Sequence, residues 1–370
     1  SFNSLDQIRV WLKDGIKVTN LHPDDSSAIQ ASNLFTDLVY YLLTNRRGGV
    51  GETLGRTDSD LDKLIDKTQL GETSKFLRAN QLFFNGAISQ PVNVRSWLAE
   101  KASYFLCDFV LSNGRFTVKP AVPVTSGGEI DTGAVSIKQI FTSGNILEDS
   151  FSLEYLEAEE RTLFKAVLRY RVEKENQLSG EATVTVRWGE GDGEVPVETF
   201  DLTDFCTSRD HAILVGKHLV SLRRRITHSC TFSTTPYGLD LAPGDYIRVI
   251  TESSPYSATR TGTIAADGTI TLATSIEDGS YDIIYYATSN TDGDVEETTI
   301  TVSNGKALDW SIAAIFSLIE TISSENVYRV EQLTLSQENT VEIAASEFPC
   351  DNNLSSLITQ DLTSSNFNVF

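Results

Sequence analysis

The feature that most constrains the fold is a change of hydrophobic period near residue 226. Before it, apolar side chains recur at the three- and four-residue spacing of one helix face, at Ala212, Val215, Leu219, Leu222 and Ile226. This spacing predicts an amphipathic helix over about 208–225, capped by Thr207 and Asp210, that packs its stripe against a sheet. After it the residues alternate as in strands, and Pro243-Gly244 predicts a tight turn into a strand.

Strands dominate the chain beyond this helix. Runs rich in β-branched and aromatic residues are separated by turn pairs such as Asp267-Gly268 and Asn304-Gly305. They predict strands at 231–234, 246–251, 269–273, 283–287, 298–303, 328–335 and 341–345. Residues 308–322 form an apolar run that fits either a helix or a buried strand.

The first 122 residues mix helices with short strands. We expect a strand at 7–12, a helix over 93–106 and a hairpin across Asn113-Gly114, with arms at 109–111 and 116–118. A further helix is expected to start at an Asp58 cap. An earlier helix, which stops at Asn45, carries the stripe Ala28, Ala31, Phe35, Leu38 and Leu42.

A stretch rich in Gly, Ser and Thr at 123–134 is the best candidate for a domain boundary. Strands at 163–172 and 183–188 follow it. The sequence therefore predicts a β-rich α+β protein in three parts. These are an α+β module at 1–122, a β-rich domain with the long helix at 123–250, and a β-rich region at 251–370.

The charge balance limits the partners. The 370 residues include 51 acidic and 30 basic ones, and the resulting net charge of −21 disfavours nucleic-acid binding as the main function. No apolar run reaches the length of a membrane span. The chain begins with Ser and contains no Met, so we interpret it as a fragment of a longer protein in preference to a processed chain.

No residue pattern predicts a catalytic, cofactor-binding or metal site, and no cofactor is expected. The histidines form no HExxH-type motif, and two of them are two turns apart on one helix, about 10.5 Å along its axis, too far to share a metal. They are His22, His211, His218 and His228. The cysteines form no CxxC pair and are interpreted as buried free thiols: Cys107, Cys206, Cys230 and Cys350.

Other polar clusters favour structural interpretations. The acidic residues Glu157, Glu159 and Glu160 are more typical of a solvated turn than of a glycosidase acid–base pair. The glycine-rich loop 48–51 lacks the Lys-Ser/Thr of a phosphate-binding loop. The oxygen-rich turns 189–194 and 289–297 could bind Ca²⁺ loosely but favour plain hairpin turns. A basic run suits a helix C-terminus better than a phosphate site: Arg223, Arg224 and Arg225.

The stretch DLTDFCTSRDHAILVGKHLVSLRRRITHSCTFSTTPYGLDLAPGDYIRVI, residues 201–250, resembles the central segment of phage tail-tip hub proteins. These are the tip-attachment (host-specificity) proteins of long-tailed phages and their relatives in gene transfer agents. In that family a Cys-Thr-containing helix ends in Leu-Arg-Arg and precedes a strand and TPYGL…PGDYIRV. Weaker similarity covers NLFTDLVYYLLTNRRGGVG at 33–51, FFNGAIS at 83–89 and YRVEQLTLSQENTVEIAA at 328–345.

The resemblance implies a structural protein of the virion at the distal end of the tail, with no catalytic residues. Its hub domains would be tail-tube-like β-barrels with helices packed outside, and three copies would close into a ring. The ring would contact the tail tube, distal tail or baseplate proteins and tail fibres, and would open for genome ejection. DNA would pass through an acidic channel without specific binding, and contact with the host surface would be indirect.

Two other classes of function stay open. A carbohydrate-binding or adhesin module of a tail fibre or cell surface would be favoured by exposed aromatic clusters around Tyr237, Tyr256 and Tyr281. A hydrolase of cell-wall polymers would need a buried carboxylate or a Cys–His pair, which the sequence does not indicate.

Overall fold

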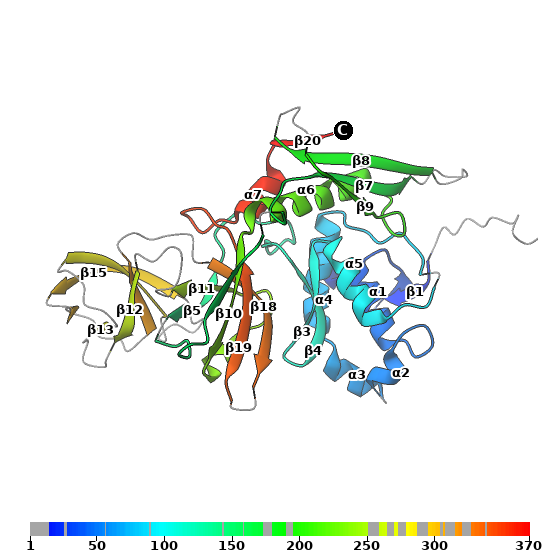
Figure 1. Cartoon of the computed structure of the whole chain (residues 1–370). Helices are drawn as coiled ribbons and strands as arrows, with labels where there is room; N and C mark the ends of the chain where they lie inside the picture. The colour runs from blue at the N-terminus through cyan, green and yellow to red at the C-terminus, as the bar shows by residue number, and fades with distance from the viewer. Residues whose placement is uncertain are drawn as a thin grey trace, which may run out of the picture. The chain divides into compact units, whose positions relative to one another are not determined.

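The computed structural model describes residues 15–25, 28–55, 57–88, 90–142, 144–157, 159–172, 180–189, 195–250, 259–264, 270–272, 279–286, 295–303, 306–307, 315–319, 327–336 and 339–370. The chain divides into two compact units, whose elements are labelled in Figure 1. Unit 1 comprises residues 1–131, 163–220 and 364–370, and unit 2 comprises residues 132–162 and 221–363. The three-part division at residues 122 and 250 stays a prediction about sequence domains.

The N-terminal part of unit 1 is mainly helical. Its elements are β1 (Lys17–Thr19), η2 (Pro23–Asp25), β2 (Ile29–Ala31), α1 (Phe35–Thr44), α2 (Gly51–Leu54), α3 (Asp58–Leu64), α4 (Lys67–Ala79), α5 (Val94–Ser103), β3 (Cys107–Ser112) and β4 (Arg115–Pro120). The expected helical stripe was wrong at its start, because Ala28 lies in a loop and Ala31 in β2. The backbone of β2 forms an antiparallel pair with β1, so these residues do not join the helix. The strand expected at 7–12 lies outside the described residues.

Local hydrogen bonds set the starts of two predicted helices. Thr57 Oγ1 accepts from the backbone N of Asp60 at 3.2 Å, and Asp60 Oδ2 accepts from the backbone N of Thr57 at 3.0 Å. This capping box makes Thr57 the cap, so Asp58 is the first helical residue rather than the cap. At the start of α5, Asn93 Oδ1 accepts from the backbone N of Ser96 at 3.2 Å, which makes Asn93 the cap.

The turns predicted at Asn113-Gly114 and Pro243-Gly244 are confirmed, whereas Asp267-Gly268 and Asn304-Gly305 lie outside the described residues. Asn113 and Gly114 have φ of 50° and 73°, the left-handed conformation that a two-residue hairpin turn requires, and they join β3 to β4. At Pro243-Gly244, the backbone N of Asp245 donates to Ala242 O at 3.0 Å. Gly244 has a φ of 94°, which only glycine adopts readily.

A four-stranded sheet with one helix forms the rest of unit 1. Its strand order is β20 (Phe367–Val369), β8 (Gly180–Trp188), β7 (Lys165–Val172) and β9 (Val197–Asp201), with β9 parallel to β7. Helix α6 (Arg209–Arg225) runs along β7 and β8 (Figure 1). The approach is close at Gly216, where a Cβ would lie 2.6 Å from Leu168 Cδ1 and 2.8 Å from Val186 Cγ2.

The predicted helix is confirmed, but its cap and its stripe differ. Ser208 is the cap, since its Oγ accepts from the backbone N of His211 at 3.3 Å. Ala212 and Val215 are buried, whereas Leu219 is only partly buried. The remaining fully buried positions of the helix are small or polar: His211, Gly216, His218, Val220 and Ser221. A helix that approaches the sheet through glycine leaves less room for large side chains on that face.

Unit 2 is built on a six-stranded sheet that curls into a half-barrel. Its strand order is β5 (Ile137–Thr142), β11 (Tyr246–Ile250), β18 (Val327–Leu335), β19 (Val341–Glu347), β10 (His228–Thr234) and β6 (Ser152–Tyr155). Phe141 on β5 and Phe232 on β10 are separated by three strands, about 19 Å in a flat sheet at 4.8 Å per strand. Their ring centroids are only 4.9 Å apart, so the sheet must bend to bring them together.

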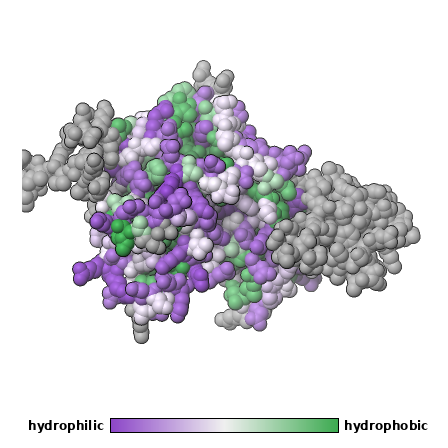
Figure 2. Space-filling view, turned by 180° about the vertical axis from the view of Figure 1, so that it is seen from behind, coloured by the Kyte–Doolittle hydropathy of each residue, from purple (hydrophilic) through white to green (hydrophobic). Residues whose placement is uncertain are grey.

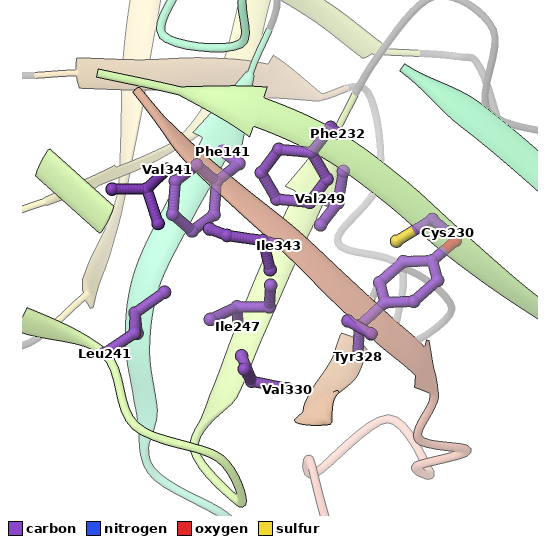
Figure 3. Close-up of a cluster of buried hydrophobic side chains, with 11 residues drawn as sticks. Phe141, Cys230, Phe232, Leu241, Ile247, Val249, Tyr328, Val330, Val341 and Ile343 are labelled. Atoms are coloured by element: carbon purple, nitrogen blue, oxygen red, sulfur yellow. The ribbon is translucent and has the colours of Figure 1, made fainter. Parts of the chain in front are cut away.

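The concave side of this sheet holds the main apolar core of unit 2 (Figure 3). Its buried members are Phe141, Cys230, Phe232, Leu241, Ile247, Val249, Tyr328, Val330, Val341, Ile343 and Ala345. A second cluster includes Ile137, Val327, Phe348 and Ile358, the last on α7 (Leu357–Thr363). The β-rich α+β class is confirmed; within the described strands the pairing order ends at β5 and β6 and does not close into a barrel.

A further six strands form their own sheet, in the order β13-β12-β17-β14-β15-β16. Their bounds are β12 (Thr259–Ile264), β13 (Ile270–Leu272), β14 (Gly279–Tyr286), β15 (Val295–Ser303), β16 (Lys306–Ala307) and β17 (Ile315–Ile319). Three of them match the predicted strands near 269–273, 283–287 and 298–303. Strand β17 settles the ambiguous run 308–322 in favour of a strand where it is described.

The contact at Gly216 predicts a specific loss of stability. Gly216→Ala places a Cβ against Leu168 and Val186 and should lower the free energy of unfolding by about 1–3 kcal/mol. Gly180→Ala on the same sheet is the matched control, because its Cβ would meet nothing within 4 Å. Urea unfolding of both variants measures the difference. Equal stabilities would show that α6 does not pack on the sheet through this glycine.

Candidate functional site

Two segments that carry the resemblance meet in unit 1. The backbone N of Asn85 donates to Phe205 O at 2.8 Å, and Asn85 Nδ2 donates to Thr207 Oγ1 at 2.8 Å. Asn85 O accepts from the Arg171 guanidinium. A Cβ on Gly86 would lie 2.0 Å from Asp204 O, so this backbone contact requires glycine. The FFNG and DFCT motifs therefore bind each other directly. We call such a contact between two motif segments a packing joint.

Aromatic rings fill the space around this joint. Phe35 and Phe105 stack with centroids 4.5 Å apart, and Phe84 stacks on Phe205 at 6.0 Å. His211, at the start of α6, lies 5.2 Å from the Phe105 ring, and its Nε2 is 2.8 Å from Tyr104 O. Burial lowers the pKa of His211 from 6.5 to about 4, so the ring is neutral near pH 7.

The loop after α1 explains the LTNRRGG motif. Asn45 Oδ1 accepts from the backbone N of Arg47 at 2.9 Å and of Gly48 at 2.6 Å. The backbone N of Val50 donates to Leu42 O at 2.8 Å, so the loop folds back on the last turn of the helix. A Cβ on Gly49 would lie 2.1 Å from that same carbonyl oxygen. Gly49 allows this close approach, and Asn45 is the C-cap residue of the helix.

The arginine run of α6 ends on a buried carboxylate in unit 2. Arg224 Nη1 lies 2.9 Å from Asp361 Oδ2, and Arg225 binds the same carboxylate through Nε at 2.9 Å and Nη2 at 2.7 Å. The Asp361 side chain is 5% exposed. Two guanidiniums therefore share one carboxylate on α7, which anchors that helix through charge-assisted hydrogen bonds.

A second polar group follows immediately along the chain. Glu347 Oε2 accepts from the backbone N of Thr227 at 2.6 Å and lies 3.3 Å from His228 Nδ1. His228 Nε2 lies 2.9 Å from Tyr328 Oη. Burial alone would raise the pKa of Glu347, but hydrogen bonds from His228 and Thr227 outweigh it and hold that pKa below its usual range. The network joins β10 to β18 and β19, the strands of the YRV segment.

The remaining histidines lie apart from these joints. His22 Nδ1 accepts from the backbone N of Asp24 at 3.2 Å, and His218 is buried on α6. Within the described residues, no group of three His, Cys, Asp or Glu side chains is arranged to hold a metal ion. In the same part of the chain no helix has the length and apolar character to cross a membrane.

Other sequence candidates have structural surroundings. The four cysteines are buried and free, as predicted, and burial raises the pKa of Cys230 to about 12. The residues of the acidic run are exposed in a turn: Glu157, Glu159 and Glu160. Tyr237 packs edge-on against Phe141 at 5.7 Å, so it does not form an exposed aromatic cluster. The turns 190–194 and 289–294, Tyr256 and the side chain of Tyr281 lie outside the described residues.

The sequence analysis did not identify two acidic residues that hold the structure together. Asp361 and Glu347 lie far along the chain from the arginines and threonine that they bind, and neither belongs to a motif. The sequence analysis explained Arg224 and Arg225 only by the preference of cations for a helix C-terminus, and it did not predict their carboxylate partner. The hydrogen bonds and ion pairs described above join strands and helices within each unit.

Searches against protein-family models and curated proteins found no match. Several solved structures align with the chain, among them three virion or tail proteins. A protein of the virion of a native gene transfer agent particle shares 10% identity at a TM-score of 0.38, over 78% of this chain and 48% of that one. A tail protein from Neisseria meningitidis shares 10% identity at 0.32, over 75% and 59%. A 43 kDa tail protein of prophage MuSo2 from Shewanella oneidensis shares 11% at 0.25, over 63% and 54%.

This chain spans about half the length of each of these three proteins.

The double ion pair at Asp361 predicts a large effect of one substitution. Asp361→Asn keeps the volume but leaves Arg224 and Arg225 without their shared charge. It should lower the free energy of unfolding by about 2–4 kcal/mol, below the range of fully buried pairs because the guanidiniums are partly exposed. Glu72→Gln, which breaks the exposed Lys75 pair, is the control and should cost about 0–1 kcal/mol. A cost as small as the control's would contradict an anchoring role.

His211 predicts a pH dependence of stability. Because its folded pKa is depressed to about 4, the unfolded chain binds a proton there more readily. Stability should fall as the pH drops from 6.5 to about 4, by up to about 3 kcal/mol from this group. His211→Gln, which keeps a donor near Tyr104 O, should remove that part of the slope. Urea midpoints between pH 4 and 8 measure it, and an unchanged slope would show that His211 titrates normally.

Proposed function

We propose that the protein is a structural component of a bacteriophage or gene-transfer-agent tail, in the tail-tip or baseplate hub. The observation that carries this proposal is the role of the residues shared with the hub family. The FFNG, DFCT and LRRRITH segments and the YRV segment supply backbone contacts, ring stacking and ion pairs within the two units. Because the residues of these motif segments make packing contacts within the protein, they support a structural function.

The finer proposal follows the resemblance. Three copies form a ring at the distal end of the tail in the virion, with the half-barrel sheet contributing to a tail-tube-like wall. The ring contacts the tail tube, distal tail or baseplate proteins and tail fibres, and it opens when the genome is ejected. Symmetric closure also removes exposed sheet edges, which supports a ring for a protein with an open six-stranded sheet.

The acidic residues are unevenly distributed between the units. Unit 2 contains 26 Asp and Glu against 9 Lys and Arg, a net charge of −17 out of the −21 of the chain. Repulsion between such a surface and DNA phosphates favours passage without adhesion. We therefore propose that unit 2 lines the channel. DNA passes through the ring and is not a bound ligand. We propose no enzymatic activity.

Oligomeric state and DNA binding test the proposal together. Native mass spectrometry and sedimentation at physiological salt should find three copies of the 40.7 kDa chain. A duplex DNA titration at the same salt should show no binding, since phosphate contacts require basic side chains. A monomer at all concentrations would contradict the ring. Reproducible hydrolysis of peptidoglycan or glycans, lost on Glu157→Gln or Glu160→Gln, would contradict the structural role.

A further inference from the structure

One face of the four-stranded sheet in unit 1 carries cations, although the chain as a whole is strongly acidic. Ala166 on β7 pairs with Val186 on β8, so the next residues outward, Lys165 and Arg187, are neighbours at the end of this register. Lys165 also pairs with Val197 on β9. Arg169 lies two residues beyond Lys165 on the same face. We call this surface the cationic face: Lys165, Val167, Arg169, Thr185, Arg187 and Val197.

Helix α6 covers the opposite side of this sheet. The buried residues Leu168 and Val186, which flank Gly216, alternate along β7 and β8 with residues of the cationic face. On the cationic face itself Val197 is 60% exposed, and Lys165 and Arg187 are partly exposed. On the side of the molecule that Figure 2 shows, hydrophilic and hydrophobic residues are interspersed.

The cations of this face differ in how they are neutralised. Arg169 pairs with Glu181 and, at 3.5 Å, with Asp201. Among the described residues, no ion pair involves Lys165 or Arg187. Two positive charges beside an exposed valine therefore remain available to an acidic partner.

Unit 2 carries a complementary surface. Residues 148–160 include edge strand β6 and its flanking turns, and their acidic side chains are exposed: Glu148, Asp149, Glu154, Glu157, Glu159 and Glu160. Tyr155 on the same strand is also exposed, at 54%. We call this the acidic edge. Its charge and its exposed ring match the cations and the valine of the cationic face.

We propose that the cationic face of one copy binds the acidic edge of a second copy of this chain. Two different surfaces of one molecule then meet, which is the head-to-tail type of contact that closes into rings. The proposal rests on the proposed function in that it assumes a ring. DNA is the less favoured occupant of the cationic face, because a chain with a net charge of −21 repels phosphate at long range.

Charge reversal tests the contact on the whole 370-residue chain at physiological salt. Lys165→Glu with Arg187→Glu should raise the dissociation constant of the assembly by at least about tenfold, because like charges then face each other. Glu157→Lys with Glu159→Lys should weaken it similarly. Combining all four substitutions should restore assembly to within about threefold of the original chain, because the charges are exchanged. Salt screens both the attraction between the two surfaces and the repulsion between the acidic chains. Charge exchange therefore tests this contact more specifically than a series of salt concentrations does.

The control applies the same change of net charge elsewhere. Lys63→Glu with Arg115→Glu alters two exposed cations on α3 and β4 and should leave assembly unchanged, with circular dichroism confirming folding of each variant. A trimer unaffected by the reversals would overturn this contact and leave the ring intact. Equal weakening by the control, or no recovery in the fourfold variant, would also overturn it. A monomeric original chain would overturn both proposals, and DNA binding lost on Lys165→Glu would assign the face to nucleic acid.

Discussion

Helix α6 makes key contacts within each unit, because its residues as far as Val220 belong to unit 1 and its last turn belongs to unit 2. Its first turn is tied into the aromatic joint by His211, and its middle approaches β7 and β8 through Gly216. Its last turn anchors α7 by placing Arg224 and Arg225 on Asp361. The segment with the strongest sequence resemblance is thus held by contacts at its start, middle and end.

The sequence predicted elements well where a single local cause decided them. The Asn113-Gly114 hairpin needs left-handed backbone, and α6 has a long unbroken period; both are confirmed. It failed where tertiary pairing overrode local pattern, as at Ala31, which pairs with β1 although it continues a helical stripe. Helix α4 was missed because its buried face includes Thr73 and Ser74, which satisfy their hydroxyls by hydrogen bonds to Val118 O and Leu70 O. The parallel pairing of β5 with β11 joins segments a hundred residues apart, which no local pattern indicates.

The candidate site was predictable in part. The motifs were visible in the sequence, but the residues that bind them were not. Asp361 and Glu347 bind Arg225 and Thr227, yet neither acidic residue belongs to a recognisable sequence pattern. Their role depends on burial, which raises the free-energy cost of a charge unless guanidinium or hydroxyl donors reach it. The distribution of charge was likewise hidden in the net value of −21, because the contrast between unit 1 and unit 2 emerges only once the discontinuous units are known.

The central claim is that these packing joints build a subunit of a ring with an acidic channel. An image reconstruction of the assembled chain by electron cryomicroscopy tests it most directly, since it shows symmetry and channel lining together. The account predicts three-fold symmetry and a channel wall in which Asp and Glu of unit 2 outnumber Lys and Arg. A monomer, an open filament, or a channel lined chiefly by Lys and Arg would contradict it.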